Sequence, residues 1–493
     1  MMSGPSDEGS EQRPRLWKFF VSCLAGGLVW AVLGSLDPRQ RTVAAVFAFT
    51  VALWMTEAVP LAVAALVSTM LLVVTGSMTG KDAFGAYGDP IVLLFIGSFI
   101  LAKSMEDCGL DRRVSYWILS QRWASRTASS MLLTLGGVAC LISLFVSNTA
   151  TTAMLLPIGL NVLRAMKTDG RGNAIATSTL LMLTWGSSIA VGTIIGTPPN
   201  VIGVGLIREA TGTGINFLQW ATFGMPVTIV MLGFAWFQLR RWPKSSVAET
   251  GEARTEAEDR FRSLGPMSGA EKVTLAAFVV AVLLWTLPGA VEYATGMGSP
   301  LAKLWAARVP EAVAALAGAA LLFVVPCPGQ PERRAMDWQR ATRIEWGTIL
   351  LFAGGLALGK AAFDSGLAKV VGHSLAESLQ VKDVWGITAL TTALGIVVSE
   401  LASNTAAAST VVPVAIALAQ GAGVNPVPAA LGATIGSNLG FMLPVSTPPN
   451  AIVYSSGLVP AKTMMRAGLV FDVVGFLVTM ACLRLILPLM GLD

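Results

Sequence analysis

The sequence has 493 residues, of which 54% are hydrophobic and only 13% are charged, and its formal net charge is +5. A soluble domain carries about 25% charged residues, so a chain this long and this apolar has no aqueous fold that hides its surface, and we predict an integral membrane protein. The single histidine excludes a metal site with two histidine ligands, and the motifs GxxxxGKS/T, GxGxxG and GxSxG are absent. We therefore expect neither ATP-driven transport nor an enzyme.

The apolar segments divide the chain into a tail and two long halves. Residues 1–15 are polar and are predicted to form a cytoplasmic N-terminal tail. Residues 16–36 are long enough to span a bilayer, which takes about 20 residues, and are predicted to be a retained first transmembrane helix. The rest is assigned as follows: repeat 1 at 40–240 with a hairpin at about 130–165, a polar cytoplasmic linker at 241–271, and repeat 2 at 272–490 with a hairpin at about 385–420.

The two halves repeat each other. Ser147-Asn148-Thr149 recurs 256 residues later as Ser403-Asn404-Thr405, and Thr197-Pro198-Pro199-Asn200 recurs 250 residues later as Thr447-Pro448-Pro449-Asn450. Two upstream blocks recur in the same order, residues 60–66 at 310–316 and residues 97–110 at 354–367. Repeats with paired interruptions at matching places indicate the binding site of a secondary transporter.

The distribution of Lys and Arg predicts the orientation in the membrane. If each repeat has five spans and each Ser-Asn-Thr segment is a hairpin that returns to its own side, 23 Lys and Arg lie on the side of the N terminus and 8 on the other. The positive-inside rule then places the N terminus in the cytoplasm and the C terminus outside. Because five is odd, the second repeat is inverted. The predicted fold class is an all-α polytopic membrane protein with 11 transmembrane helices, two re-entrant hairpins and inverted five-helix repeats.

The paired breaks supply the chemistry for a small anion and a hard cation. Each Ser-Asn-Thr tip marks the start of a half-helix, whose free N–H groups and dipole bind an anion without a basic side chain. Two such tips suit a small dianion. Ser143 and Ser399 precede the tips by one helical turn, and the consecutive prolines free the carbonyls of Gly196 and Ser446 to coordinate a cation. A single Ser-Asn-Thr would more often be an interhelical hydrogen-bonding patch, but its paired recurrence favours a binding site.

For four ionisable residues in apolar segments, the sequence is compatible with more than one role. Lys103 and Lys360 are expected to reach the membrane surface from the ends of their segments rather than to bind substrate. Glu57 and Glu400 are candidates either for function or for packing and ion pairing.

With these four motifs, the sequence resembles the divalent anion sodium symporters (DASS), the family of dicarboxylate and citrate carriers. The resemblance implies a homodimer of eleven-helix protomers, each with a scaffold part and a mobile part that works by an elevator movement. The substrate contacts that it implies are Ser147, Asn148, Thr149, Ser403, Asn404, Thr405, Thr447 and Pro448. The implied sodium ligands are Ser143, Ser147, Asn148 and Gly196 at a first site, and Ser399, Ala402, Asn404 and Ser446 at a second.

The expected function is a sodium-coupled symporter that imports C4-dicarboxylates such as succinate, fumarate and malate. Its partners would be the dicarboxylate, Na+ bound and co-transported at about two sites, the lipid bilayer of a bacterial inner membrane and a second copy of the chain, with no nucleic acid. The alternatives are a sodium-independent dicarboxylate exchanger and a carrier of tricarboxylate or sulfate.

Overall fold

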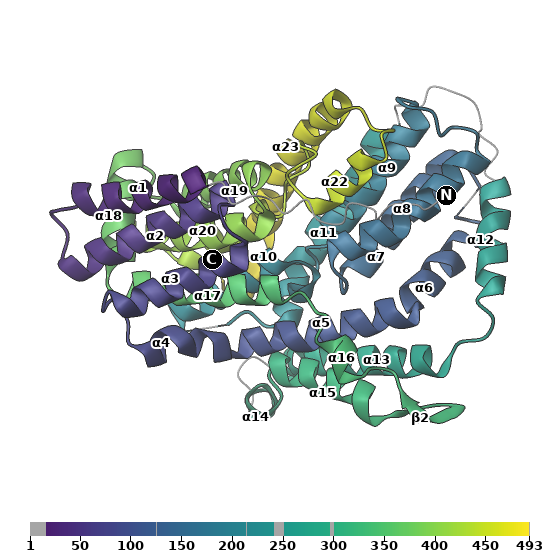
Figure 1. The fold of residues 1–493 in the computed structure, drawn as a ribbon, viewed down its shortest axis with the longest axis horizontal. Coiled ribbons are helices and arrows are strands. Elements are labelled where there is room, and N and C mark those ends of the chain that lie inside the picture. Colours follow the sequence, from purple (N-terminus) through teal and green to yellow (C-terminus); the bar gives the residue numbers. More distant parts are fainter. Residues whose placement is uncertain (1–15, 125, 213, 241–250, 296–299, 493) are drawn as a thin grey trace, which may run out of the picture.

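The computed structural model describes residues 16–124, 126–212, 214–240, 251–295 and 300–492. The predicted tail, 1–15, and the first ten residues of the predicted linker, 241–250, lie outside the described residues. The described chain is a bundle of helices with one short β-hairpin (Figure 1).

The elements before the linker are α1 (Leu16–Val32), α2 (Pro38–Thr56), α3 (Leu61–Val74), α4 (Gly80–Gly85), η1 (Ala86–Gly88), α5 (Pro90–Cys108), α6 (Leu110–Leu119), α7 (Ala128–Ser143), α8 (Asn148–Ala165), α9 (Ala174–Ser188), η2 (Ile194–Gly196), α10 (Pro198–Thr211) and α11 (Phe217–Leu239). Those that follow are α12 (Gly251–Ser263), α13 (Gly269–Thr295), α14 (Pro300–Arg308), α15 (Glu311–Val324), β1 (Pro326–Cys327), β2 (Gln330–Arg334), α16 (Trp338–Ala341), α17 (Trp346–Asp364), α18 (Leu367–Leu379), α19 (Val384–Leu401), α20 (Asn404–Gly421), α21 (Pro426–Gly436), α22 (Pro448–Ser455), α23 (Ala461–Ile486) and η3 (Pro488–Met490).

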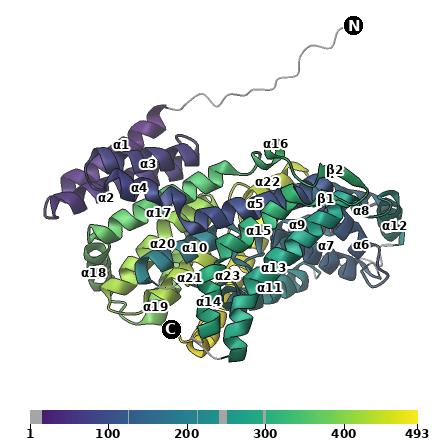
Figure 2. The same cartoon turned by 90° about the horizontal axis from the view of Figure 1, so that it is seen from below.

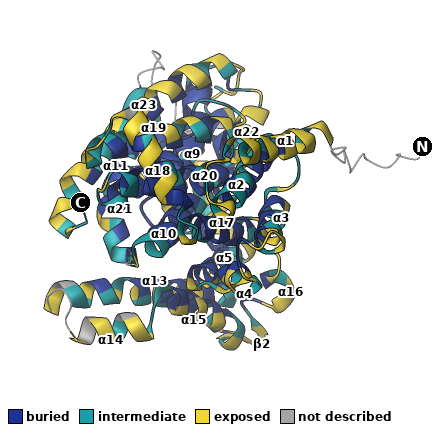
Figure 3. Cartoon of the chain, turned by 90° about the vertical axis from the view of Figure 1, so that its left-hand side faces the viewer, coloured by how far each residue is buried: buried dark blue, intermediate teal, exposed yellow. Residues whose placement is uncertain are grey.

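Several helices have the length and apolarity of membrane spans. Within the described residues, six segments qualify, namely Gly80–Cys108, Phe217–Leu239, Gly269–Glu292, Trp346–Asp364, Val384–Leu401 and Ala461–Met490. Exposed residues gather on outer helices such as α1, α18 and α23 (Figure 3), and many of them, such as Leu24, Val473 and Leu477, are large and apolar. Such a surface is stable against lipid tails, as expected of a polytopic membrane protein. The number of spans and their inversion stay predictions.

Two buried helices form the centre of the bundle. From Ile175 to Ser188 every residue of α9 is buried, and so is every residue of α21 from Val427 to Gly436. Both helices are apolar or small on all sides, which is the pattern of a helix surrounded by others. α9 packs against α7 and α8, and α21 packs in the same way against α19 and α20. The two halves therefore build corresponding three-helix groups.

The halves also cross over, so that a helix of one packs on a helix of the other. α5 packs on α15 with Gly97 against Ala315, and α17 packs on α3 with Gly354 against Ala65. These four positions correspond in the sequence repeat. A Cβ at Gly97 would lie 2.8 Å from the Cβ of Ala315, and one at Gly354 would lie 2.6 Å from the Cβ of Ala65. Glycine is needed at both crossings because the backbones approach too closely for a side chain.

A test of this packing compares two glycines in the middle of helices. Gly354→Val is expected to destabilise the protein by at least about 1–3 kcal/mol, the usual cost of overpacking, because the backbone of Ala65 blocks the new side chain. Gly233→Val in α11 is the control, since nothing lies within 4 Å of a Cβ there. Thermal unfolding in detergent measures the difference, and equal unfolding temperatures for the two variants would contradict the crossing.

Two features differ from the expected all-α chain with a plain polar linker. The linker contains the helix α12, whose buried Ala257 faces α6 and α8. Between α15 and α16 the strands β1 and β2 pair in an antiparallel hairpin, with Gly329 at φ +82° in the turn. Neither segment shows an apolar period in the sequence, because both are short and partly exposed.

The apolar interior consists of two clusters. The larger includes residues of α5 to α13 and α15 to α23, and the smaller joins α2 and α3 to one side of α17. In Figure 2, α1 to α4 stand as a group at one end of the molecule. The candidate functional site lies at the boundary between this group and the rest of the molecule.

Candidate functional site

The two Ser-Asn-Thr motifs lie at the starts of two long helices. α8 begins at Asn148 and α20 at Asn404, and each has 18 residues. Ser147 caps α8 by accepting a hydrogen bond from the backbone N–H of Ala150 at 3.2 Å, and Ser403 caps α20 in the same way through Ala406. A serine cap fixes where the helix begins and leaves the other first-turn N–H groups free.

The two Thr-Pro-Pro-Asn motifs begin two further helices. Pro198 and Pro448 are the first residues of α10 and α22, a position where the missing N–H costs nothing. Thr197 and Thr447 precede them in extended conformation. α10 packs on α20 and α22 packs on α8, so each proline break lies against the tip helix of the other half.

One cavity of about 400 Å³ collects all four helix starts. All eight predicted substrate residues line it: Ser147, Asn148, Thr149, Ser403, Asn404, Thr405, Thr447 and Pro448. Its lining contains no Lys or Arg among the described residues, and Glu345 is the charged residue there. Positive potential in this cavity comes from helix N-termini, each equivalent to about half an elementary charge.

The cavity also contains residues that the sequence prediction missed. Ser188, Thr197 and Asn438 line it, and each has a buried side-chain oxygen without a hydrogen-bond partner in the described structure. The sequence repeat held the signal for one of them, since Thr197 corresponds to the predicted residue Thr447. The starts of α3 and α17 form another wall, with Pro60, Leu61, Ala62, Glu345, Gly347, Thr348 and Leu351. Three lining residues with unsatisfied oxygens are consistent with a polar ligand.

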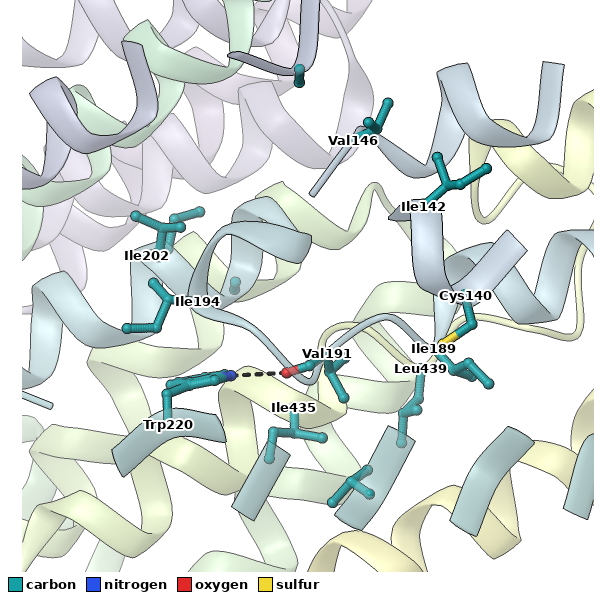
Figure 4. Packing of buried hydrophobic residues seen from close by; sticks show 14 of the residues in the cluster. Cys140, Ile142, Val146, Ile189, Val191, Ile194, Ile202, Trp220, Ile435 and Leu439 are labelled. Carbon is teal, nitrogen blue, oxygen red and sulfur yellow. Dashed lines mark hydrogen bonds between the residues drawn. The ribbon is translucent and has the colours of Figure 1, made fainter. Parts of the chain in front are cut away.

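The first proline break is held rigidly inside the core. Figure 4 shows the segment from Ile189 to Ile194 among apolar side chains, with the indole of Trp220 donating to the carbonyl of Val191 at 2.8 Å. The side chain of Asn200 donates to the carbonyls of Val191 and Thr193 at 3.3 and 2.8 Å. These bonds satisfy carbonyls that have left the helical pattern, as a break at membrane depth requires.

Oxygen atoms converge at the second break in a way that fits a hard cation. The hydroxyl oxygen of Ser399 lies 2.8 Å from both Asn404 Oδ1 and the carbonyl oxygen of Ser437, so two acceptors compete for its single proton. A Cβ built on Gly440 would lie 3.0 Å from Ser399 Oγ and 3.4 Å from Asn404 Oδ1 and from the carbonyl oxygen of Ser399. Three oxygens therefore surround one point beside Gly440, the donor type that Na+ binds at unwound helix segments.

The first break has the corresponding serine and asparagine. The hydroxyl of Ser143 donates to Asn148 Oδ1 at 2.6 Å, and Ser143 is fully buried. Gly196 lies in the buried turn η2, and Ala402 directly follows α19. In the described structure neither Gly196 nor Ala402 is hydrogen-bonded to the Ser–Asn pair of its half. The hydroxyl of Ser446 shares its proton between the carbonyl oxygens of Gly440 and Leu443. The structure thus brings together Ser143 with Asn148 and Ser399 with Asn404.

The remaining ionisable candidates lie outside the cavity. Lys103 forms ion pairs with Glu106 and Asp107, both at 3.0 Å. Lys360 pairs with Glu209 at 3.1 Å and with Asp364 at 3.6 Å.

Glu57 is exposed and ends α2 in the left-handed conformation, away from the cavity lining. In the described part of the chain no group of three or more His, Cys, Asp or Glu is placed to hold a metal. The chemistry of the site is therefore that of hydroxyls, amides and carbonyls.

Comparison with known proteins gives matches over nearly the whole chain. Residues 14–491 match the family described as the sodium:sulfate symporter transmembrane region. The sodium-dependent dicarboxylate transporter SdcS of Staphylococcus aureus (strain bovine RF122 / ET3-1) is 32% identical over 501 residues, which cover 95% of this chain and 93% of that protein.

Two solved structures are similar in fold. The YdaH transporter of Alcanivorax borkumensis aligns with a TM-score of 0.56 at 14% identity, over 97% of this chain and 98% of its own. MtrF of Neisseria gonorrhoeae aligns with a TM-score of 0.54 at 15% identity, over 84% of this chain and 83% of its own. At such identities the likeness concerns the fold alone, and both structures are transporters.

Proposed function

The chain belongs to the sodium:sulfate symporter family, the divalent anion sodium symporters that its motifs resemble, and from this premise we propose that it is a sodium-coupled symporter for C4-dicarboxylates. It is a membrane transporter and not an enzyme. The observation that carries the proposal is the single cavity into which four helix N-termini open without a basic side chain. SdcS, a sodium-dependent dicarboxylate transporter, supports the choice of substrate and ion.

The dicarboxylate is proposed to lie between the two tips. One carboxylate accepts from the first-turn N–H groups and side chains at Ser147, Asn148 and Thr149, and the other from those at Ser403, Asn404 and Thr405. Thr447, Pro448 and the unpartnered oxygens of the cavity complete the polar lining. Two separate tips recognise two separate carboxylates, which favours a dianion over a single anionic group.

Sodium is proposed to bind behind each tip and to share its asparagine with the substrate site. Ser143 and Ser399 bind through their hydroxyls, and Asn148 and Asn404 through Oδ1. The remaining predicted ligands, Ser147, Gly196, Ala402 and Ser446, would contribute backbone or hydroxyl oxygens. Positive charge behind the tips offsets the charge of the dianion, so that each ligand raises the affinity of the other.

Transport is proposed to proceed by an elevator movement in a homodimer in a bacterial inner membrane. The starts of α3 and α17 line the cavity, and both lie on the cytoplasmic side in the orientation predicted from Lys and Arg. α3 belongs to the smaller apolar cluster, the proline breaks and their buried surroundings belong to the larger, and α17 contributes residues to both.

Uptake into proteoliposomes tests the proposal. Radiolabelled succinate is offered with an inward sodium gradient or with potassium instead, in vesicles without internal substrate. Unlabelled fumarate, malate, citrate and sulfate compete. Sodium-dependent accumulation blocked by C4-dicarboxylates is expected. Uptake that needs internal substrate and ignores sodium would indicate an exchanger, and block by sulfate or citrate alone would assign a different cargo.

The serines that precede the two tips, Ser143 and Ser399, give a prediction for the sodium dependence of uptake. Ser143→Ala or Ser399→Ala removes a ligand worth about 1.4 kcal/mol, which raises the sodium concentration for half-maximal uptake about tenfold. Ser409→Ala is the control, because its buried hydroxyl lies in α20 outside the cavity. Unchanged sodium dependence in both ligand variants would exclude these hydroxyls from the ion sites.

A further inference from the structure

Two carboxylates are buried together outside the cavity. Glu400 on α19 and Asp472 on α23 are 7% and 3% exposed. The two oxygens of Glu400 accept hydrogen bonds from the backbone N–H groups of Met442 at 2.7 Å and Leu443 at 3.0 Å. Asp472 lies beside Glu400 and the backbone of Phe441.

The close approach of α23 brings the second carboxylate to the first. Gly468 precedes Asp472 by one helical turn on the same face of α23. A Cβ on Gly468 would lie 2.3 Å from the carbonyl oxygen of Phe441 and 2.5 Å from the Cα of Met442. Glycine thus lets α23 lie directly on the segment that Glu400 holds from α19.

No neighbouring basic group in the described structure balances the negative charge of the Glu400–Asp472 pair. Within the described residues, neither carboxylate oxygen of Asp472 has a hydrogen bond of normal geometry, and the groups beside it are the Glu400 carboxylate and the Phe441 backbone. No Lys, Arg or His in that part of the chain forms an ion pair with Glu400 or Asp472. Buried carboxylates without a counter-charge are costly, and in proteins they are paired or coordinate a cation.

We propose that Glu400 and Asp472 hold a cation, separate from the ions behind the two tips. One backbone N–H group donates to each oxygen of Glu400, and these two bonds hold the carboxylate in place. A proton shared between the carboxylates would use only one oxygen of Asp472, whereas a cation engages both oxygens. Carboxylate oxygens suit a hard cation. The identity of this cation as Na+ rests on the proposed sodium coupling.

The position of the pair links this ion to the second break. Glu400 directly follows Ser399, and it holds the N–H groups of Met442 and Leu443 in the segment that leads to Ser446. An ion that fixes Glu400 therefore also fixes Ser399, whose oxygens lie near the point beside Gly440, and the segment that follows Gly440. Its loss is expected to weaken sodium binding at the second break as well.

Equilibrium binding of radioactive sodium to the purified full-length protein, at neutral pH and without substrate, tests the site. Asp472→Asn and Glu400→Gln keep the side-chain shape and remove the charge, so each variant is expected to bind at least one sodium ion fewer per protomer than wild type. Thr479→Val is the control, because Thr479 is buried on the same face of α23 and its hydroxyl also lacks a partner. It is expected to bind the wild-type number. Gel filtration monitors folding, and Glu400→Gln carries the test if Asp472→Asn misfolds.

Wild-type stoichiometry in both acid variants would show that the pair binds a proton or no ion, and would overturn the proposal. Ser143→Ala and Ser399→Ala in the same assay report on the ions behind the tips. If those variants bind sodium with wild-type affinity while the acid variants lose an ion, the serine ligands behind the tips are wrong and the acid site stands. A wild type that binds no sodium overturns both.

Discussion

Asn148→Ala or Asn404→Ala is expected to abolish sodium-dependent succinate uptake in proteoliposomes while leaving a folded protein. Each asparagine both lines the cavity and accepts a hydrogen bond from the serine behind its tip. The substitution therefore removes a substrate donor and a sodium ligand at once. Each interaction with a charged partner is worth about 1.5–3 kcal/mol, and the two losses multiply to about 100-fold or more in transport at limiting sodium and substrate.

Asn161→Ala provides the matched control, because Asn161 lies in the same helix as Asn148 but outside the cavity. Gel filtration and thermal unfolding in detergent establish that the variants fold. Full uptake in both tip variants would refute the assignment of the substrate site. Loss in Asn148→Ala alone would confine substrate recognition to the first tip.

The sequence predicted best those parts of the site that depend on local backbone chemistry. A serine cap, an asparagine and consecutive prolines fix where a helix begins, whatever packs around it. All eight predicted substrate residues consequently lie at helix starts on one cavity. Repetition made the motifs visible, because the same local pattern in both halves is improbable without a shared role.

Contacts between distant segments could not be read in the same way. Asn438 lines the cavity only because α21 ends beside the tips, and the second carboxylate of the acid pair comes from α23. The local sequence pattern predicts neither of these contacts. The crossings of α5 with α15 and of α17 with α3 also required the structure, although Gly97 and Gly354 were already matched in the repeat.

The two proline breaks also differ in a way that the repeat alone hides. Gly196 corresponds to Ser446, and Ala190 corresponds to Gly440. At the second break the hydroxyl of Ser446 donates to the carbonyl of Gly440 at 2.8 Å. At the first break a Cβ on Gly196 would lie only 2.2 Å from the carbonyl oxygen of Ala190. The same position therefore accepts a side chain in one half and excludes it in the other.

Gly196→Ser is accordingly expected to destabilise the protein by at least about 1–3 kcal/mol and to eliminate uptake. The blocking carbonyl lies next to Val191, which Trp220 and Asn200 hold in place, so relief would have to come from displacing the start of α10 in the cavity. The reciprocal change, Ser446→Gly, loses the hydrogen bond that the hydroxyl donates and the one that it accepts from Asn450, each worth about 1 kcal/mol, but keeps the backbone carbonyl. It should retain sodium-dependent uptake. Thermal unfolding and uptake are measured for both variants. Equal effects of Gly196→Ser and Ser446→Gly would mean that the two breaks have the same geometry.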